Sequence, residues 1–371
     1  MTLTILSKNK TLEIKAIAIL TIALHNFFHW IEPYKCGENE FYFNPSRVHC
    51  FLNTLTNSPA DCVNTVFSFL GHYGVVVFVL LSGYGLTLSM MKNKVGFREF
   101  ICKRVVKLWL LLLVGIVIFF FSKFVIEGET FSGYDWKHIG YRTFFIHTLI
   151  PDCGTKMVGP WWFFGLIFQL YLLFPILFKL FEKRKFKLLS TIAIICIIFS
   201  YFCVYGLMPD VEVYVFMNAP GYLPVFILGM WLARSQGREM SFVIAIIALI
   251  IFMLGNFYKA FFPLTFLSVG ILTISCVFLL RKSDDRIGRQ NRILVFIGEI
   301  SMIIFVSNGV LRDPFVTMAN NLGTASGRYC SAILFLFTTI IISILGYFVY
   351  QKSFEFLKKK THFFIKKSNN K

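Results

Sequence analysis

The stretch IKAIAILTIALHNFFHW, residues 14–30, joins an apolar run to two histidines four residues apart. A membrane-spanning helix needs about 20 predominantly apolar residues, and this run approaches that length. Residues four apart lie on one face of a helix, so His25 and His29 share a face. Polar groups inside a bilayer tend to face the bundle interior or a pathway. The stretch therefore predicts a transmembrane helix with a functional imidazole pair. Histidines wetted at the outer interface are the alternative.

The composition of the whole chain favours the same environment. Of 371 residues, 57% are hydrophobic and only 15% are charged, which is too apolar for a soluble domain of this length. A backbone in lipid must satisfy its own hydrogen bonds, and long apolar segments do so as helices. The sequence predicts an all-α integral membrane protein with about ten transmembrane helices in one bundle. The expected spans are 14–31, 65–91, 105–126, 161–181, 188–207, 219–233, 241–257, 261–280, 293–311 and 330–350.

Positive charge is distributed unevenly over the loops between these spans. If the N-terminus is inside, 28 of the 37 Lys and Arg residues fall on the inner side. This asymmetry is typical of cytoplasmic loops and predicts that both termini are cytoplasmic. It places outer loops at about 32–64 and 127–160, a membrane domain over 1–350 and a basic cytoplasmic tail at 351–371. Because the lipid bilayer explains the net charge of +18, nucleic acid is not an expected partner.

Basic residues gather where the third predicted span begins. Lys103, Arg104 and Lys107 stack at its inner mouth. On the first span, Lys15 lies about 15 Å from His25 toward the cytoplasm, at 1.5 Å per residue. Guanidinium and ammonium groups suit phosphates, so these residues are candidates for binding a phosphorylated donor. A simple positive-inside anchor is the alternative.

Other polar and aromatic side chains lie in or beside the predicted spans. They are Asn26, His72, Trp162, Gln169 and Asn308. The amides can bond neighbouring helices, His72 is expected at the outer interface beside the imidazole pair, and Trp162 opens the fourth span. The sequence has no metal-ligand spacing, phosphate-binding glycine loop or nucleophile elbow. We therefore expect no metal cofactor.

Four cysteines lie in the predicted outer loops. Cys36, Cys50 and Cys62 are in the first loop, and Cys153 is in the second. An oxidising compartment would allow a disulfide among them. A disulfide and unpaired cysteines are both compatible with the sequence.

Several segments, taken in order, resemble those of the membrane acyltransferase-3 family. The run IKAIAILTIALH is similar to the basic residue, apolar run and histidine with which that family opens. GHYGVVVFVLLSGYGL, residues 71–86, resembles its GxxGVDLFFVLSGFLI segment. FICKRVVKL places Arg104 and Lys107 in the basic positions of its third segment. WFFGLIFQLYLLFP at 162–175 and SMIIFVSN at 301–308 resemble two later ones.

The chain departs from the family pattern at several positions. Eleven residues after the basic residue, where the family has its histidine, this chain has Asn26, one residue after His25. Further departures from the family's acidic and histidine positions are Val76, Ile167, Phe168 and Asn308. The assignment of the proton-handling residue between His25 and His29 therefore stays open.

The resemblance implies transfer of an acyl group, often acetyl, from acetyl-CoA on the inner side to a hydroxyl reached from the membrane or outer side. The acceptor would be a cell-envelope or capsular polysaccharide, and the enzyme would lie in the cell membrane. By this resemblance, the candidates for catalysis are His25, His29 and Asn26, those for the donor are Lys15, Lys103, Arg104 and Lys107, and those for the acceptor are His72, Trp162, Gln169 and Asn308.

Two other functions fit the same spans. A transporter or flippase also places polar residues inside a polytopic bundle. A glycan polymerase would rely on acidic or arginine residues in large outer loops. Release of CoA with and without a glycan acceptor separates the three functions.

Overall fold

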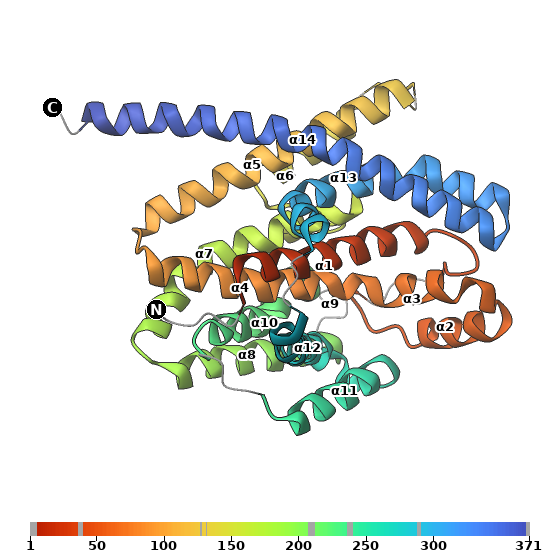
Figure 1. Ribbon diagram of the computed structural model, residues 1–371, viewed down its shortest axis with the longest axis horizontal. Helices are drawn as coiled ribbons and strands as arrows, with labels where there is room; N and C mark the ends of the chain where they lie inside the picture. The colour runs from red at the N-terminus through yellow and green to blue at the C-terminus, as the bar shows by residue number, and fades with distance from the viewer. Residues whose placement is uncertain are drawn as a thin grey trace.

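The structure, a computed structural model, is helical throughout the regular elements that it describes. The described residues are 6–35, 40–126, 128–130, 132–206, 212–235, 240–287 and 291–368. Most of the long helices run along one common direction and pack side by side (Figure 1). This arrangement confirms the predicted all-α class.

The elements follow one another with short connections. The α-helices are α1 (Lys8–Phe28), α2 (Ser46–Asn57), α3 (Cys62–Leu70), α4 (Gly74–Lys92), α5 (Phe97–Phe121), α6 (Gly133–Thr143), α7 (Trp162–Glu182), α8 (Phe186–Val204), α9 (Glu212–Met217), α10 (Ala219–Leu232), α11 (Phe242–Phe257), α12 (Thr265–Ile287), α13 (Arg292–Leu322) and α14 (Ala325–Ser368). Single turns of 3₁₀ or π helix are η1 (Pro59–Asp61), η2 (Gly71–Tyr73), η3 (Ser122–Ile126), η4 (His147–Leu149), η5 (Gly159–Trp161) and η7 (Lys259–Leu264).

In the described part of the chain, eight helical segments are long and apolar enough to cross a membrane. They correspond to eight of the ten predicted spans. The sixth and seventh predicted spans are α10, with 14 residues, and α11, with 16, which are apolar but shorter. Helix α10 packs against α4, α8 and α12, so other helices shield much of it. The number of crossings stays a prediction.

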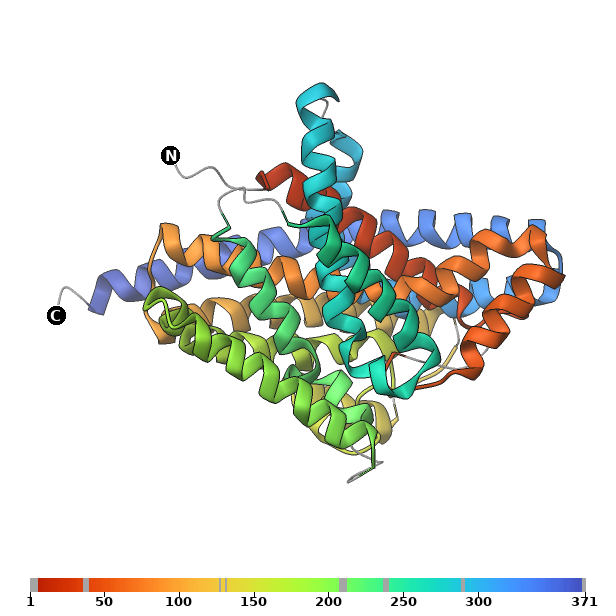
Figure 2. The ribbon, with the colours of Figure 1, turned by 90° about the horizontal axis from the view of Figure 1, so that it is seen from below.

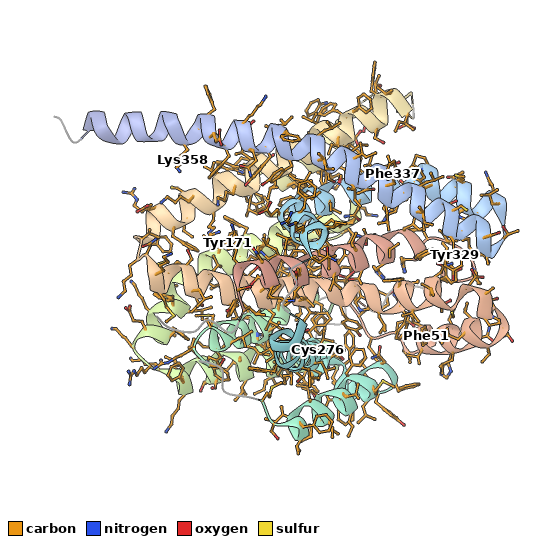
Figure 3. The ribbon with its side chains drawn as sticks, in the orientation of Figure 1. Phe51, Tyr171, Cys276, Tyr329, Phe337 and Lys358 are labelled. Atoms are coloured by element: carbon orange, nitrogen blue, oxygen red, sulfur yellow. The ribbon has the colours of Figure 1, made fainter. Side chains whose placement is uncertain are left out.

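The two ends of the bundle can be followed in the figures. Helix α1 begins and α14 ends on the same side (Figure 2), as an even number of crossings requires. Helix α14 continues without a break from the last predicted span through the predicted tail to Ser368. Tyr329 lies near its start, and Lys358 lies toward its other end (Figure 3). The side of the membrane on which the ends lie stays a prediction.

Glycines allow a close helix contact in the core, between α4 and α10. A Cβ added to Gly83 would lie 2.2 Å from the Phe226 carbonyl oxygen, and one added to Gly229 would lie 2.1 Å from that of Leu80. Small residues allow helix backbones to approach closely in membranes. The glycine pattern of the second predicted span is therefore a packing feature.

Both outer loops are folded. The first forms α2 and η1 and leads into α3; α2 packs against α3, which in turn packs against α1. The second forms α6, η4 and η5, and the Lys123 ammonium of η3 binds the Asp135 carboxylate of α6 at 3.0 Å. Cys62 and Cys153 are free, whereas Cys50 is disulfide-bonded. The fourth outer-loop cysteine, Cys36, lies outside the described residues.

Candidate active site

Three histidines gather at the outer end of the bundle. The ring centroid of His25 on α1 lies 5.4 Å from that of His29, the residue that caps this helix, and 5.3 Å from that of His72 on η2. All three are buried, with 3%, 7% and 2% of their surfaces exposed. The structure thus brings His72 together with the imidazole pair.

A backbone carbonyl sets the orientation of His25. Its Nδ1 lies 2.8 Å from the Ser68 carbonyl oxygen. A carbonyl only accepts hydrogen bonds, so Nδ1 donates and the neutral ring carries its lone pair on Nε2. The buried Arg47 guanidinium donates to the same carbonyl. This arrangement prepares Nε2 to accept a proton.

His72 differs from His25 in its bonding. Neither of its ring nitrogens meets the geometry of a hydrogen bond with a described group, although the Phe69 carbonyl is close enough to act on it electrostatically. No set of three or more His, Cys, Asp or Glu side chains in the described residues is placed to hold a metal ion. The buried His72 ring therefore has hydrogen-bonding capacity beside His25 that the described groups do not use.

A cavity of about 210 Å³ lies toward the other end of the bundle. Six helices line it: α1, α4, α5, α7, α13 and α14. Its polar lining residues are Lys15, Ser82, Arg104, Lys107, Tyr171, Glu299, Tyr347 and Tyr350. The histidines do not line this cavity, and His25 is about 15 Å from Lys15 along α1.

The structure gathers three of the four predicted donor-binding residues. Lys15, Arg104 and Lys107 line the cavity. Lys103 instead forms an ion pair with Glu99 on the surface of α5, where 63% of its side chain is exposed. Successive residues on a helix point about 100° apart, since 3.6 residues make one turn. Lys103 and Arg104 therefore face different directions.

Aromatic rings support the cations in the cavity. The Arg104 guanidinium lies 5.4 Å from the centre of the Phe100 ring and 5.7 Å from that of Tyr171. The Lys107 ammonium lies 5.1 Å from the centre of the Phe354 ring. A cation within about 6 Å of a ring centre is attracted to the ring face. These contacts orient both charged side chains.

The site thus has two centres, the histidine cluster and the basic cavity, and several residues of both were not predicted from the sequence. Tyr171 follows Gln169 by two residues in the fourth predicted span. This position beside a polar residue was the only sequence feature that could have indicated a role in the site. Tyr347 and Tyr350 lie in the last span without a polar pattern around them. Arg47 was one of several charged residues in an outer loop, and only the folded structure shows that it is buried beside His25.

Asn26 and Asn308 meet each other rather than the histidines. The Asn26 amide nitrogen donates to the Asn308 side-chain oxygen at 2.8 Å. The Asn308 amide in turn donates to the carbonyls of Ile304 and Phe305. The pair joins α1 to α13. Asn26 also lies eleven residues, about three turns, from Lys15 and on the same face of α1.

Gln169 and Trp162 lie in a separate outer region. The Gln169 amide donates to the Asn218 side chain, and its oxygen accepts from the Ala219 backbone at 2.9 Å. The Trp162 ring packs edge-on against Phe41, with centroids 5.2 Å apart. Because these protein contacts occupy the Gln169 amide, the geometry gives it a structural role between α7 and α10.

Comparison with known proteins agrees with this architecture. The model of the acyltransferase-3 family, described as an acyltransferase domain, matches residues 13–348. The match includes every site residue predicted from the sequence. No curated protein and no solved structure matches the chain significantly. Because the family model covers most of the chain, the protein belongs to the acyltransferase-3 family and is a multi-pass membrane acyltransferase.

Proposed function

We propose that the protein transfers an acetyl group from acetyl-CoA to a hydroxyl of a cell-envelope or capsular polysaccharide. The observation that carries this proposal is the pairing of two centres in one bundle. A basic cavity lies toward one end, and a buried imidazole with an oriented base nitrogen lies toward the other. The cell membrane is the proposed location, with the cavity toward the cytoplasm, where acyl-CoA is made.

The cavity suits an anionic donor. Lys15 lines it and makes no ion pair with a described residue. A cation inside an apolar bundle is costly unless something compensates its charge. Together with Arg104 and Lys107, Lys15 would hold the donor's phosphates. Lys103 lies outside this set.

The separation of the two centres favours a long donor. The cavity and His25 are about 15 Å apart along α1. The donor must therefore carry its phosphates and its reactive carbonyl at opposite ends of an extended arm, as acetyl-CoA does. An arm that rises along the Lys15 face of α1 would reach Asn26, whose amide would orient the thioester carbonyl.

The chemistry follows from the His25 tautomer. Nε2 of His25 takes the proton of the acceptor hydroxyl, and the oxygen attacks the thioester carbonyl. The carbon–sulfur bond breaks, and the thiolate takes up a proton to give free CoA. His72 would bond the same hydroxyl and fix its direction of attack. His29 is the alternative base.

The test uses the purified full-length protein in lipid nanodiscs. Acetyl-CoA and envelope polysaccharide are added, and both CoA release and ester formation on the glycan are measured. We expect His25→Ala to lose on the order of 10²–10⁴-fold in rate, the usual contribution of a general base. If His25→Ala and His29→Ala both leave glycan acetylation unchanged, the mechanism is wrong. Glycan movement across vesicles without CoA release would identify a transporter instead.

A further inference from the structure

Helix α3 ends at the His25 ring. Its last intrahelical hydrogen bond runs from the Gly71 amide to the Phe67 carbonyl, so the next carbonyl, that of Ser68, is free to bond outside the helix. That carbonyl accepts from His25 Nδ1 at 2.8 Å and from Arg47. The C-terminal end of a helix carries partial negative charge and stabilises a nearby cation.

The other end of α3 is held by a buried carboxylate. Asp61, the residue that precedes α3, is 2% exposed. The Arg328 guanidinium of α14 donates to both of its oxygens, from Nε at 3.0 Å and from a terminal nitrogen at 2.5 Å. The Tyr34 hydroxyl donates to the same carboxylate at 2.5 Å. Bidentate hydrogen bonds between arginine and a carboxylate are strong and restrict direction as well as distance.

Neighbouring bonds make this attachment rigid. The Asn64 amide donates to the Tyr34 hydroxyl at 3.1 Å and to Asp61 at 3.3 Å. Arg328 also donates to the Gly323 carbonyl at 3.1 Å, in the turn between α13 and α14. The first turn of α3 is thus tied to the outer end of α14, the end that Tyr329 marks in Figure 3.

We propose that the Asp61–Arg328 ion pair is a positioning device for His25 and that α3 transmits its effect. The ion pair holds α3 so that the Ser68 carbonyl keeps the proton on Nδ1 and the lone pair on Nε2. The same carbonyl end stabilises the imidazolium that forms when His25 takes the hydroxyl proton. A buried carboxylate does this in serine hydrolases. The inference rests on the proposed catalytic role of His25.

The packing of α3 explains why a change at Asp61 reaches His25. Seven residues, about 10 Å of helix, separate Asp61 from Ser68. A Cβ added to Gly71 would lie 2.6 Å from the His25 Cβ, so the end of α3 is pressed against α1. A hydrogen bond weakens steeply beyond about 3.2 Å, and a misplacement of about 1 Å can lower a rate on the order of 10²-fold.

The first experiment compares Arg328→Gln and Asp61→Asn with the wild type in nanodiscs. We expect kcat to fall by roughly tenfold or more in both variants, because the base is misplaced. The KM for acetyl-CoA should stay within about twofold, because the donor cavity lies toward the other end of the bundle. Arg328→Lys keeps the charge without the bidentate geometry, so its kcat should fall less than that of Arg328→Gln.

The matched control is Lys123→Gln. It removes the ion pairs of Lys123 with Asp135 and Glu129, which join η3 to the second outer loop, away from α3. Its kcat should equal that of the wild type. Equal losses of kcat in Lys123→Gln and Arg328→Gln would overturn the proposal, because any loosened outer loop would then have the same effect. A matching loss of acetyl-CoA binding in Arg328→Gln would also overturn it.

A second measurement does not depend on activity. Hydrogen exchange at the C2 carbon of the His25 ring, followed by mass spectrometry, reports its protonation and surroundings. We expect the exchange rate to change in Arg328→Gln and to stay constant in Lys123→Gln. If the wild type releases no CoA but His25 still responds to Arg328→Gln, the proposed function fails and the positioning role stands. Unchanged exchange together with unchanged kcat overturns the positioning role.

Discussion

Neighbouring residues on α1 meet different partners, and this separates roles that the sequence leaves open. His25 bonds the Ser68 carbonyl, Asn26 bonds Asn308, and the His29 ring packs edge-on against Trp30 at 5.6 Å. Periodicity predicts that His25 and His29 share a face. It does not predict which backbone carbonyl meets either ring, because that depends on α3, an element far away in the chain. For the same reason, the sequence did not predict that Arg104 lines the cavity and that Lys103 does not.

Lys15 offers a direct test of the cavity. We expect Lys15→Met to raise the KM for acetyl-CoA by roughly tenfold, equivalent to about 1.4 kcal/mol of binding free energy, with little change in kcat. The reason is that Lys15 lines the cavity, whereas Lys103 pairs with Glu99 outside it. Lys103→Met is therefore the control and should leave KM unchanged. Steady-state kinetics of both variants check this, and equal effects would contradict the assignment.

His147 supplies a prediction about pH. Burial, with a smaller effect from Arg142, lowers the pKa of this outer-loop ring to about 3. The ring titrates near 6.5 when unfolded, so on acidification the unfolded state binds a proton that the folded state does not. The free energy of unfolding is therefore unaffected by His147 above pH 6.5 and decreases as the pH falls from 6.5 toward 3. By pH 5 the loss is about 2 kcal/mol.

Thermal unfolding in detergent at pH 7 and pH 5 measures this effect. His147→Gln keeps a donor for the Trp161 carbonyl, which the His147 Nε2 approaches to 3.1 Å, but does not titrate. The variant should lose less Tm on acidification than the wild type. His49→Gln, at an exposed position on α2, should behave like the wild type. Parallel losses in all three proteins would show that another group titrates.

At the scale of helices, apolar runs predicted where the spans lie but not how they pair. Eight predicted spans coincide with long apolar helices, and their ends shift by a few residues. Helix α2 of the first outer loop was not predicted, because it is short and carries no long apolar run. Most of α3 lies in the predicted second span, but the break between α3 and α4 was not predicted. The position of α3 depends on bonds between residues far apart in the chain, those of Asp61 with Arg328 and of the Ser68 carbonyl with His25. Pairing between distant helices is set by contacts that no local pattern records.

The α4–α10 contact can be tested with two glycines of the same helix. Gly83→Ala would place a methyl group 2.2 Å from the Phe226 carbonyl oxygen, so we expect a lower Tm and a lower yield of folded protein. Gly85 has nothing within 4 Å of an added Cβ. Gly85→Ala should be neutral or stabilise by up to about 1 kcal/mol, since alanine is the better helix former. Fluorescence-detected size exclusion and thermal unfolding compare the two, and equal stability would contradict the close contact.

At the scale of the whole molecule, the two centres divide the bundle into a basic end and an imidazole end. The motifs predict a basic group where the third span begins and a histidine pair at the far end of the first span, because each motif carries its polar residues at a characteristic place in a span. The family match over residues 13–348 includes most of the residues of both centres. Orientation in the membrane is a separate matter. It rests on the charge asymmetry of the loops, which reflects how the chain inserts rather than how it packs.

Native cysteines can determine that orientation. Cys62 is free and exposed at the start of α3, and Cys102 is free and exposed near the start of α5, at the opposite end of the bundle. If the N-terminus is cytoplasmic, a membrane-impermeant maleimide applied to intact cells should label Cys62. It should label Cys102 only after permeabilisation, because loops at the basic end face the cytoplasm. Mass spectrometry identifies the labelled peptides, and Cys62→Ser and Cys102→Ser are the controls. Labelling of Cys102 in intact cells would reverse the orientation and place the basic cavity on the side away from acyl-CoA.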